Sequence, residues 1–156
     1  MDKKYTIYCD MDGVLVDFNE GYKKLTGIDI RGQYLNDKGF WKPIDEGGVD
    51  FWYNLPWMPD GKTLWDYIKK YEPDILSAPS REDSSRVGKH KWVNKHLPGV
   101  HLILRSVEHK KEFASPTSVL IDDRKENIDS WVEAGGIGIL HTNTSDTIKQ
   151  LKKLGL

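Results

Sequence analysis

The fold is decided by residues 5–18, which read Tyr-Thr-Ile-Tyr-Cys-Asp-Met-Asp-Gly-Val-Leu-Val-Asp-Phe. The run from Tyr5 to Cys9 is short and β-prone, so it predicts a buried strand. Asp10, Asp12 and Gly13 follow directly, where the strand gives way to a loop. Ligands bind outside the carboxyl ends of strands in open parallel sheets, so this junction is the first candidate site.

Further short apolar strands alternate with amphipathic helices along the chain. The strands are expected at 74–77, 101–104, 118–121 and 138–140. Helices are expected from Val14 to about Leu25, from Asp60 toward Pro73, around Trp92, around Trp131 and through Ile148 to Leu154. Parallel strands need crossover connections, so this alternation predicts an α/β fold, a three-layer Rossmann-like parallel sheet flanked by helices.

The length of 156 residues fits one domain. Its core is expected to comprise residues 1–17 and 61–156, with an insert at about 18–60. From about Thr26 to Gly61 the sequence shows no clear period and carries many glycine, proline and aromatic residues. This composition indicates an irregular insert with short helices.

Composition excludes several classes of protein. Hydrophobic residues make up 38% and charged residues 30% of the chain, as in folded globular proteins. The net charge of -1 argues against a stable nucleic-acid partner, which normally needs an excess of cations. No apolar run approaches the roughly 20 residues that span a membrane, and the N-terminus lacks a signal-peptide pattern. A cytoplasmic protein without a membrane partner is expected.

Polar side chains follow three of the predicted strands. Asp10 and Asp12 follow the first strand, Ser77 ends the second, and Asp122 and Asp123 follow the fourth. Carboxylates gathered at one edge repel one another and need a cation. Oxygen ligands of this kind suit Mg²⁺, which keeps waters or a substrate phosphate as its other ligands.

Other metal and phosphate sites fit the sequence poorly. Zinc is a poor fit because Cys9 is the only cysteine and the five histidines lack ligand spacing. A helix-loop-helix calcium loop fails because Val14 stands at the next ligand position. A Walker-type phosphate loop is absent. Cys9 is expected to pack inside the first strand.

Four elements in this order resemble the signature of the haloacid dehalogenase-like (HAD) phosphatases: residues 5–14, residues 75–77, Lys89 and residues 120–123. The resemblance covers almost the whole chain. Three stretches resemble the 5'(3')-deoxyribonucleotidase branch more closely: residues 10–18, Gly39-Phe40-Trp41 and residues 120–124.

The resemblance implies a phosphohydrolase mechanism with assigned carboxylates. Asp10 would be the nucleophile and form an aspartyl-phosphate. Asp12 would protonate the leaving alcohol and later deprotonate the attacking water. Asp10, the main-chain carbonyl of Asp12, and Asp123 would hold Mg²⁺, while Asp122 would ligate through water or orient the site.

The resemblance also implies a set of phosphate ligands. Ser77 would donate a hydrogen bond, and Lys89 would neutralise phosphate charge. Lys111 would be a second cation, although Lys110 fits almost as well. Relatives carry Thr-Ser-Pro where this chain has Ser-Ala-Pro, so Ala78 lacks a hydroxyl and leaves a backbone amide as the alternative contact.

In this family the insert after the first motif is a small helical cap, and here it is rich in aromatic residues. Phe18 and Trp41 match positions that line the base pocket of relatives, and base stacking is worth about 1–3 kcal/mol. The implied substrate is a nucleoside monophosphate. The competing interpretation is that these rings pack a short irregular segment.

Alternative functions stay open from the sequence alone. Another small phosphate ester or a nucleic-acid end could be the substrate, or the chain could be a binding module without turnover. The acids, Ser77 and Lys89 also have structural alternatives, as a solvated turn, a helix cap or a surface lysine. A homodimer is likewise left open.

Overall fold

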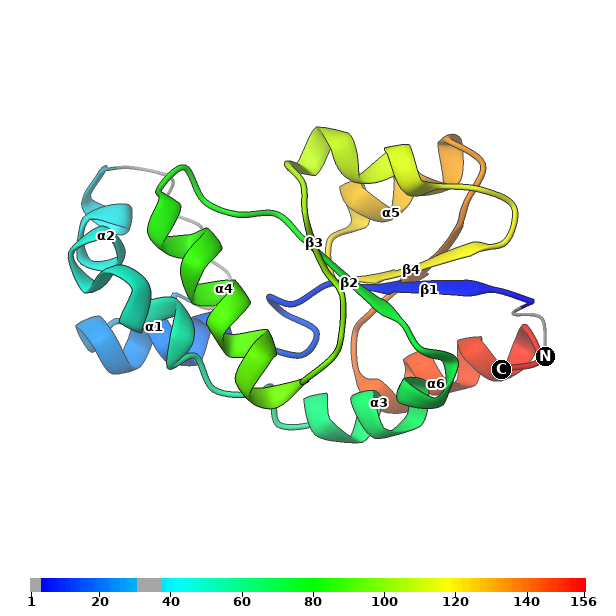
Figure 1. The fold of residues 1–156 in the computed structure, drawn as a ribbon, viewed down its shortest axis with the longest axis horizontal. Helices are drawn as coiled ribbons and strands as arrows, with labels where there is room; N and C mark the ends of the chain where they lie inside the picture. The colour runs from blue at the N-terminus through cyan, green and yellow to red at the C-terminus, as the bar shows by residue number, and fades with distance from the viewer. Residues whose placement is uncertain (1–3, 31–37) are drawn as a thin grey trace. The chain divides into compact units, whose positions relative to one another are not determined.

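The computed structural model describes residues 4–30 and 38–156. Five strands form one parallel sheet in the order β3-β2-β1-β4-β5 (Figure 1). The strands are β1 (Thr6–Cys9), β2 (Asp74–Ser77), β3 (Leu102–Leu104), β4 (Ser118–Asp122) and β5 (Ile137–Leu140). The sheet confirms the α/β fold class. Part of the expected insert, residues 31–37, lies outside the described residues.

The strand order places a topological switch at the centre of the sheet. From β1 the chain builds outward through β2 and β3, and it then returns to the other side of β1 to add β4 and β5. Strand β4 is buried along all five of its residues, as expected for a strand covered on both faces. Ligands bind at such switch points, here between the carboxyl ends of β1 and β4.

Helices cover both faces of the sheet (Figure 1). One face carries α5 (Lys125–Glu133) and the 3-10 helix η2 (Val107–Phe113), and the other carries α3 (Gly61–Ile68) and α6 (Thr144–Lys153). A short 3-10 helix, η1 (Lys69–Tyr71), extends α3. Among the residues that the structure describes, no helix has the length and apolar character to cross a bilayer.

The chain divides into two compact units. Unit 1 comprises Met1–Val16, Trp57–Ala78 and Val100–Leu156, and it contains the sheet. Unit 2 comprises Asp17–Pro56 and Pro79–Gly99. Its helices are α1 (Phe18–Thr26), α2 (Lys38–Tyr53) and α4 (Asp83–His96). The segment expected as an insert supplies α1 and α2, and α4 groups with them.

The first helix begins later than its apolar spacing predicts. It was expected from Val14 but begins at Phe18. The carbonyl oxygen of Met11 accepts the backbone N–H groups of residues 14–16, which closes a tight turn instead. The Asp17 carboxylate then accepts a first-turn N–H at 3.0 Å and caps the helix. Residues 14–16, which the apolar spacing assigned to the helix, therefore belong to this turn.

Helix α2 accounts for much of the expected insert. It covers 16 residues but is interrupted at Gly48, where φ is 59° and ψ is -144°. Only glycine adopts this backbone region without strain. The element is therefore two short helical pieces joined at a glycine, in keeping with the short helices expected for this segment.

We expect Trp131→Ala to destabilise the fold by about 3–5 kcal/mol, because it would leave a large cavity under the sheet. The Trp131 ring is fully buried, lies 5.5 Å from the Tyr8 ring and donates to Ser118 O at 3.2 Å. Denaturant unfolding would measure the loss. Val132→Ala is the control, since Val132 is 52% exposed and should change stability by less than about 0.5 kcal/mol. Equal effects of the two changes would contradict this account of the core.

Candidate active site

The carboxyl edge of the sheet brings together three of the four acids predicted from the sequence. Asp10 follows β1, and Asp122 and Asp123 stand at the end of β4 beside it. The backbone N–H of Asp10 donates to Ile121 O at 3.0 Å, which extends the pairing of the two strands by one residue. These residues therefore lie on either side of the switch point.

The three acids form one cluster. One carboxylate oxygen each from Asp10, Asp122 and Asp123 lies within 4.8 Å of the others. Asp10 is 6% exposed and Asp122 is fully buried. Asp123 is partly exposed. Carboxylates this close repel one another, and a site of oxygen ligands with this spacing fits a hard divalent cation such as Mg²⁺.

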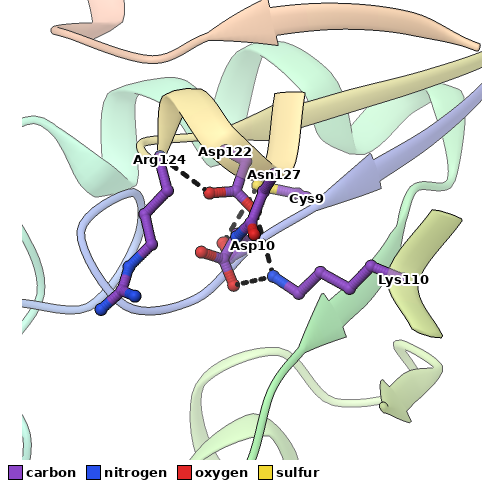
Figure 2. Close-up of polar contacts among 6 residues, drawn as sticks. All are labelled: Cys9, Asp10, Lys110, Asp122, Arg124 and Asn127. Atoms are coloured by element: carbon purple, nitrogen blue, oxygen red, sulfur yellow. Dashed lines mark hydrogen bonds and ion pairs between the residues drawn. The ribbon is translucent and has the colours of Figure 1, made fainter. Parts of the chain in front are cut away.

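A buried lysine joins two of these acids (Figure 2). Lys110 Nζ donates to Asp10 Oδ1 at 3.2 Å and to Asp122 Oδ2 at 3.0 Å. Lys110 lies on η2 and is 4% exposed, whereas Lys111 is exposed. The structure thus brings Lys110, and not the expected Lys111, to the acid cluster.

Asp122 is held by three donors. Besides Lys110, its Oδ2 accepts from Asn127 Nδ2 at 3.1 Å, and its Oδ1 accepts from the backbone N–H of Arg124 at 2.9 Å (Figure 2). Both carboxylate oxygens are engaged, and the side chain has little freedom to turn. Asp122 is therefore placed to orient its neighbours.

The loop after β1 passes close to Asp123. Gly13 has φ of 83°, and a Cβ at this position would collide with the Asp123 carboxylate. Glycine is therefore required at position 13 for two reasons: it adopts the positive φ, and it leaves room for the Asp123 carboxylate. Burial, followed by repulsion from Asp122, raises the pKa of Asp123 to about 6. The nearby Asp12 carboxylate also contributes to this rise.

The charges of the cluster do not balance without a further cation. Burial raises the pKa of Asp10 to about 8, because attraction by Lys110 only partly offsets burial and the neighbouring acids. Burial alone would lower the pKa of Lys110, but Asp10 and Asp122 hold it above its ordinary value. At neutral pH a divalent cation would favour the ionised form of Asp10, so the donor set and its charge both fit Mg²⁺.

Cys9 lies directly behind the nucleophile candidate. It is fully buried in β1, as expected, and its thiol donates to the carbonyl oxygen of Asp10 at 3.5 Å. Burial, together with the charges of Asp10 and Asp122, raises the pKa of this thiol well above its ordinary value. The sulfur therefore stays protonated and contributes no ligand.

The expected phosphate-binding turn begins at the same edge of the sheet. Ser77 is fully buried at the end of β2, the strand on the other side of β1. The Ser77 carbonyl accepts the backbone N–H of Arg105 at 3.0 Å, which prolongs the pairing with β3. Ala78 follows and is half-buried.

The remaining predicted residues belong to unit 2. Lys89 lies on α4 and is 1% exposed, which excludes the interpretation of a solvated surface lysine. Phe18 and Trp41 lie on α1 and α2, with ring centroids 6.4 Å apart, and both are half-buried. Phe18 also contacts Phe51 and Trp52, so packing accounts for at least part of this aromatic group.

Two residues of the site were passed over or missed in the sequence. Lys110 could have been chosen over Lys111 from its spacing, because side chains three apart share a face of a 3-10 helix. Phe113, three residues after Lys110, packs against the core. Asn127 carries no comparable signal, since an amide in a helical first turn is usually a solvated or capping residue.

No family model matches the chain, and no curated protein matches its sequence. Solved structures do match it. A hydrolase from Streptococcus pneumoniae TIGR4 shares 14% identity at a TM-score of 0.59, over 97% of this chain and 100% of that one. A predicted phosphatase from Clostridium acetobutylicum shares 13% identity at a TM-score of 0.57, over 99% of this chain and 100% of the other.

A HAD family hydrolase from Deinococcus radiodurans R1, with bound phosphate and sodium, shares 13% identity at a TM-score of 0.54. The match covers 91% of this chain and 83% of that one. The chain has the fold of the HAD-superfamily hydrolases. In this fold the acid cluster stands at the carboxyl edge of the sheet, where ligands of parallel sheets bind.

We expect Asp10→Asn to stabilise the metal-free protein at pH 8. The pKa of Asp10 is higher in the folded chain, about 8 against 3.8, so its contribution to stability is present at low pH and is lost as the pH rises toward 8. In chelator, thermal melts of wild type should therefore fall between about pH 4 and pH 8 relative to the variant.

Magnesium should reverse this difference at pH 8, because it binds the ionised carboxylates of wild type. Asp45→Asn, a change at an exposed acid, is the control and should leave both effects unchanged. Parallel pH profiles of wild type and Asp10→Asn, with equal responses to magnesium, would contradict this description of the cluster.

Proposed function

We propose that the chain is a magnesium-dependent phosphatase that hydrolyses nucleoside monophosphates through an aspartyl-phosphate on Asp10. The observation that carries the proposal is the setting of Asp10. This buried carboxylate at the switch point is held by Lys110 and lies within 4.8 Å of two further acids. The HAD fold, found in hydrolases and in a predicted phosphatase, supports the same chemistry.

The reaction has two displacements at phosphorus. In the first, a carboxylate oxygen of Asp10 forms a bond to phosphorus while the bond to the ester oxygen breaks. Asp12 gives its proton to that oxygen, and the nucleoside leaves. In the second, Asp12 takes a proton from water, the water oxygen attacks phosphorus, and the bond to Asp10 breaks. Inorganic phosphate leaves, and Asp10 is regenerated.

Asp10, Asp123 and the main-chain carbonyl of Asp12 would hold the magnesium ion, and Asp122 would orient them. When bound, magnesium supplies positive charge that reduces the repulsion between Asp10 and the phosphate dianion. Lys110 acts in the same direction, because it favours the charged form of Asp10 and fixes one of its oxygens. Two anions can then approach within bonding distance.

The phosphate oxygens need donors of their own. Ser77, the backbone amide of Ala78 and Lys89 are the residues that we propose for this role. Lys110 replaces Lys111 as the other cation in the proposal, because Lys110 Nζ contacts Asp10 Oδ1 at 3.2 Å whereas the Lys111 side chain is exposed.

The aromatic residues support a nucleotide as the substrate. Phe18 and Trp41 are half-buried, unlike Phe40 and Trp52, which are 5% and 3% exposed. We propose that the nucleobase stacks on these two rings.

Asp10→Asn should abolish phosphate release. An amide cannot form the aspartyl-phosphate, so activity on nucleoside monophosphates should fall by at least about 10³-fold. Chelation of magnesium in the wild-type assay should have a similar effect, and added magnesium should restore it. Malachite-green detection of phosphate measures both. A variant as active as wild type would end the nucleophile assignment.

Lys110→Met should lower kcat/KM strongly, because it leaves Asp10 and Asp122 as buried acids without their shared cation. Lys111→Met is the matched control, one residue away and exposed, and should retain activity within about two-fold. Melting temperatures of both variants report whether they fold. Loss of activity in Lys111→Met but not in Lys110→Met would show that Lys111 is the second cation, as expected from the sequence.

Nucleoside monophosphates should be hydrolysed in preference to sugar phosphates and phosphoamino acids. Trp41→Ala should raise KM for a nucleotide by about 5- to 100-fold, the equivalent of one lost stacking contact, and leave KM for p-nitrophenyl phosphate closer to wild type. A substrate panel and steady-state kinetics test both. Release of phosphate from sugar phosphates alone, or from nucleic-acid ends alone, would support a phosphatase activity. It would contradict the proposal that the substrate is a nucleoside monophosphate.

A further inference from the structure

Lys89 is buried to a degree that is rare for lysine, with 1% of its surface exposed. A buried ammonium loses its hydration, and that loss must be offset by its surroundings. Its Nζ lies 5.1 Å from the centroid of the Trp52 ring on α2. This distance is within the range of a cation–π interaction, which is strongest with tryptophan and in desolvated surroundings.

The backbone at Gly88 brings the two helices together at this point. A Cβ at Gly88 would collide with the side chain of Trp52 and would lie 2.9 Å from Val49 O. Only glycine therefore permits this approach of α4 to α2. Lys89, the next residue along α4, is carried close to the indole as a direct consequence.

The indole ring is fixed by its other neighbours. Trp52 is 3% exposed, and its ring lies 5.1 Å from Phe51 and 5.8 Å from Phe18. One turn beyond Gly88, Trp92 donates its indole N–H to Leu55 O at 2.9 Å and fastens α4 to the segment after α2. The ring therefore presents a rigid surface to the ammonium of Lys89.

We infer that Trp52 is a positioning residue that holds the Lys89 ammonium for the phosphate group of the substrate. The inference rests on the proposed function, in which Lys89 binds phosphate. An aromatic face attracts a cation through its quadrupole and carries no net charge. A carboxylate in its place would attract Lys89 equally well but would repel the phosphate dianion.

The same two helices contain a matched control pair. Lys95 Nζ lies 5.1 Å from the centroid of the Tyr53 ring, the same distance as between Lys89 and Trp52. Lys95 is exposed and Tyr53 is half-buried. This pair crosses from α4 to α2 in the same way and lies outside the proposed machinery. Its removal reports the effect of weakening helix contacts alone.

Trp52→Leu should lower kcat/KM for p-nitrophenyl phosphate by about 10- to 30-fold, the equivalent of one desolvated cation–π contact. Trp52→Phe, which keeps an aromatic face, should recover most of this loss. Tyr53→Leu should remain within about two-fold of wild type. Thermal melts of each protein with and without magnesium report whether it is folded. If Trp52→Leu does not fold, Trp52→Phe can still be compared with wild type.

The deciding measurement is a double-mutant cycle with Lys89→Met. If Trp52 acts through Lys89, Trp52→Leu should have little further effect in the Lys89→Met background. Equal losses in both backgrounds, or an equal loss in Tyr53→Leu, would show a packing role and overturn the inference. A wild type that releases no phosphate from any ester would instead end the proposed function, and the inference with it. An impaired Lys89→Met beside an unimpaired Trp52→Leu would overturn the inference alone.

Discussion

The site depends on one ammonium group shared between two buried carboxylates. Lys110 contacts Asp10 at 3.2 Å and Asp122 at 3.0 Å, and thereby ties the ends of β1 and β4 to η2. Breaking such a pair leaves an uncompensated buried charge and is strongly destabilising. One cation cannot neutralise the whole cluster, so negative charge remains at the edge of the sheet. That surplus would favour a divalent cation at this edge, where the same residues would then contribute to folding and to metal binding.

The two aspartates that share Lys110 differ in what else holds them. Asp122 accepts three hydrogen bonds through both oxygens and is rigid. Asp10 contacts Lys110 through Oδ1 alone. Burial raises the pKa of Asp10 to about 8, so its ionisation depends on what else binds nearby. A fixed acid beside a second acid whose charge responds to its surroundings would suit the covalent phosphoryl transfer that we propose for Asp10.

Much of the fold could be predicted from the sequence, because buried parallel strands and crossover helices leave strong patterns. All five strands were located, and Asp10, Ser77 and Asp122 could be assigned to the ends of three of them, although the order of the strands in the sheet came only from the structure. The start of α1 was misplaced, since the apolar residues at 14–16 serve a turn around Met11 O as well as they would serve a helix. Lys110 could have been chosen from its spacing to Phe113, but the contact of Asn127 with Asp122 is a tertiary one that neighbouring residues in the sequence do not reveal. The packing of Trp52 against Gly88 could not be predicted from the sequence either, because a lone glycine inside a helix usually indicates only a lower helix propensity.

The thiol behind Asp10 bears on how the protein would respond to oxidants. Cys9 is the only cysteine in the chain, it is fully buried, and its pKa is held well above the ordinary value. Alkylating agents and peroxides react with thiolates that solvent can reach. The sulfur nearest the acid cluster is therefore shielded from both. Oxidants should therefore leave this sulfur unmodified for as long as β1 stays folded.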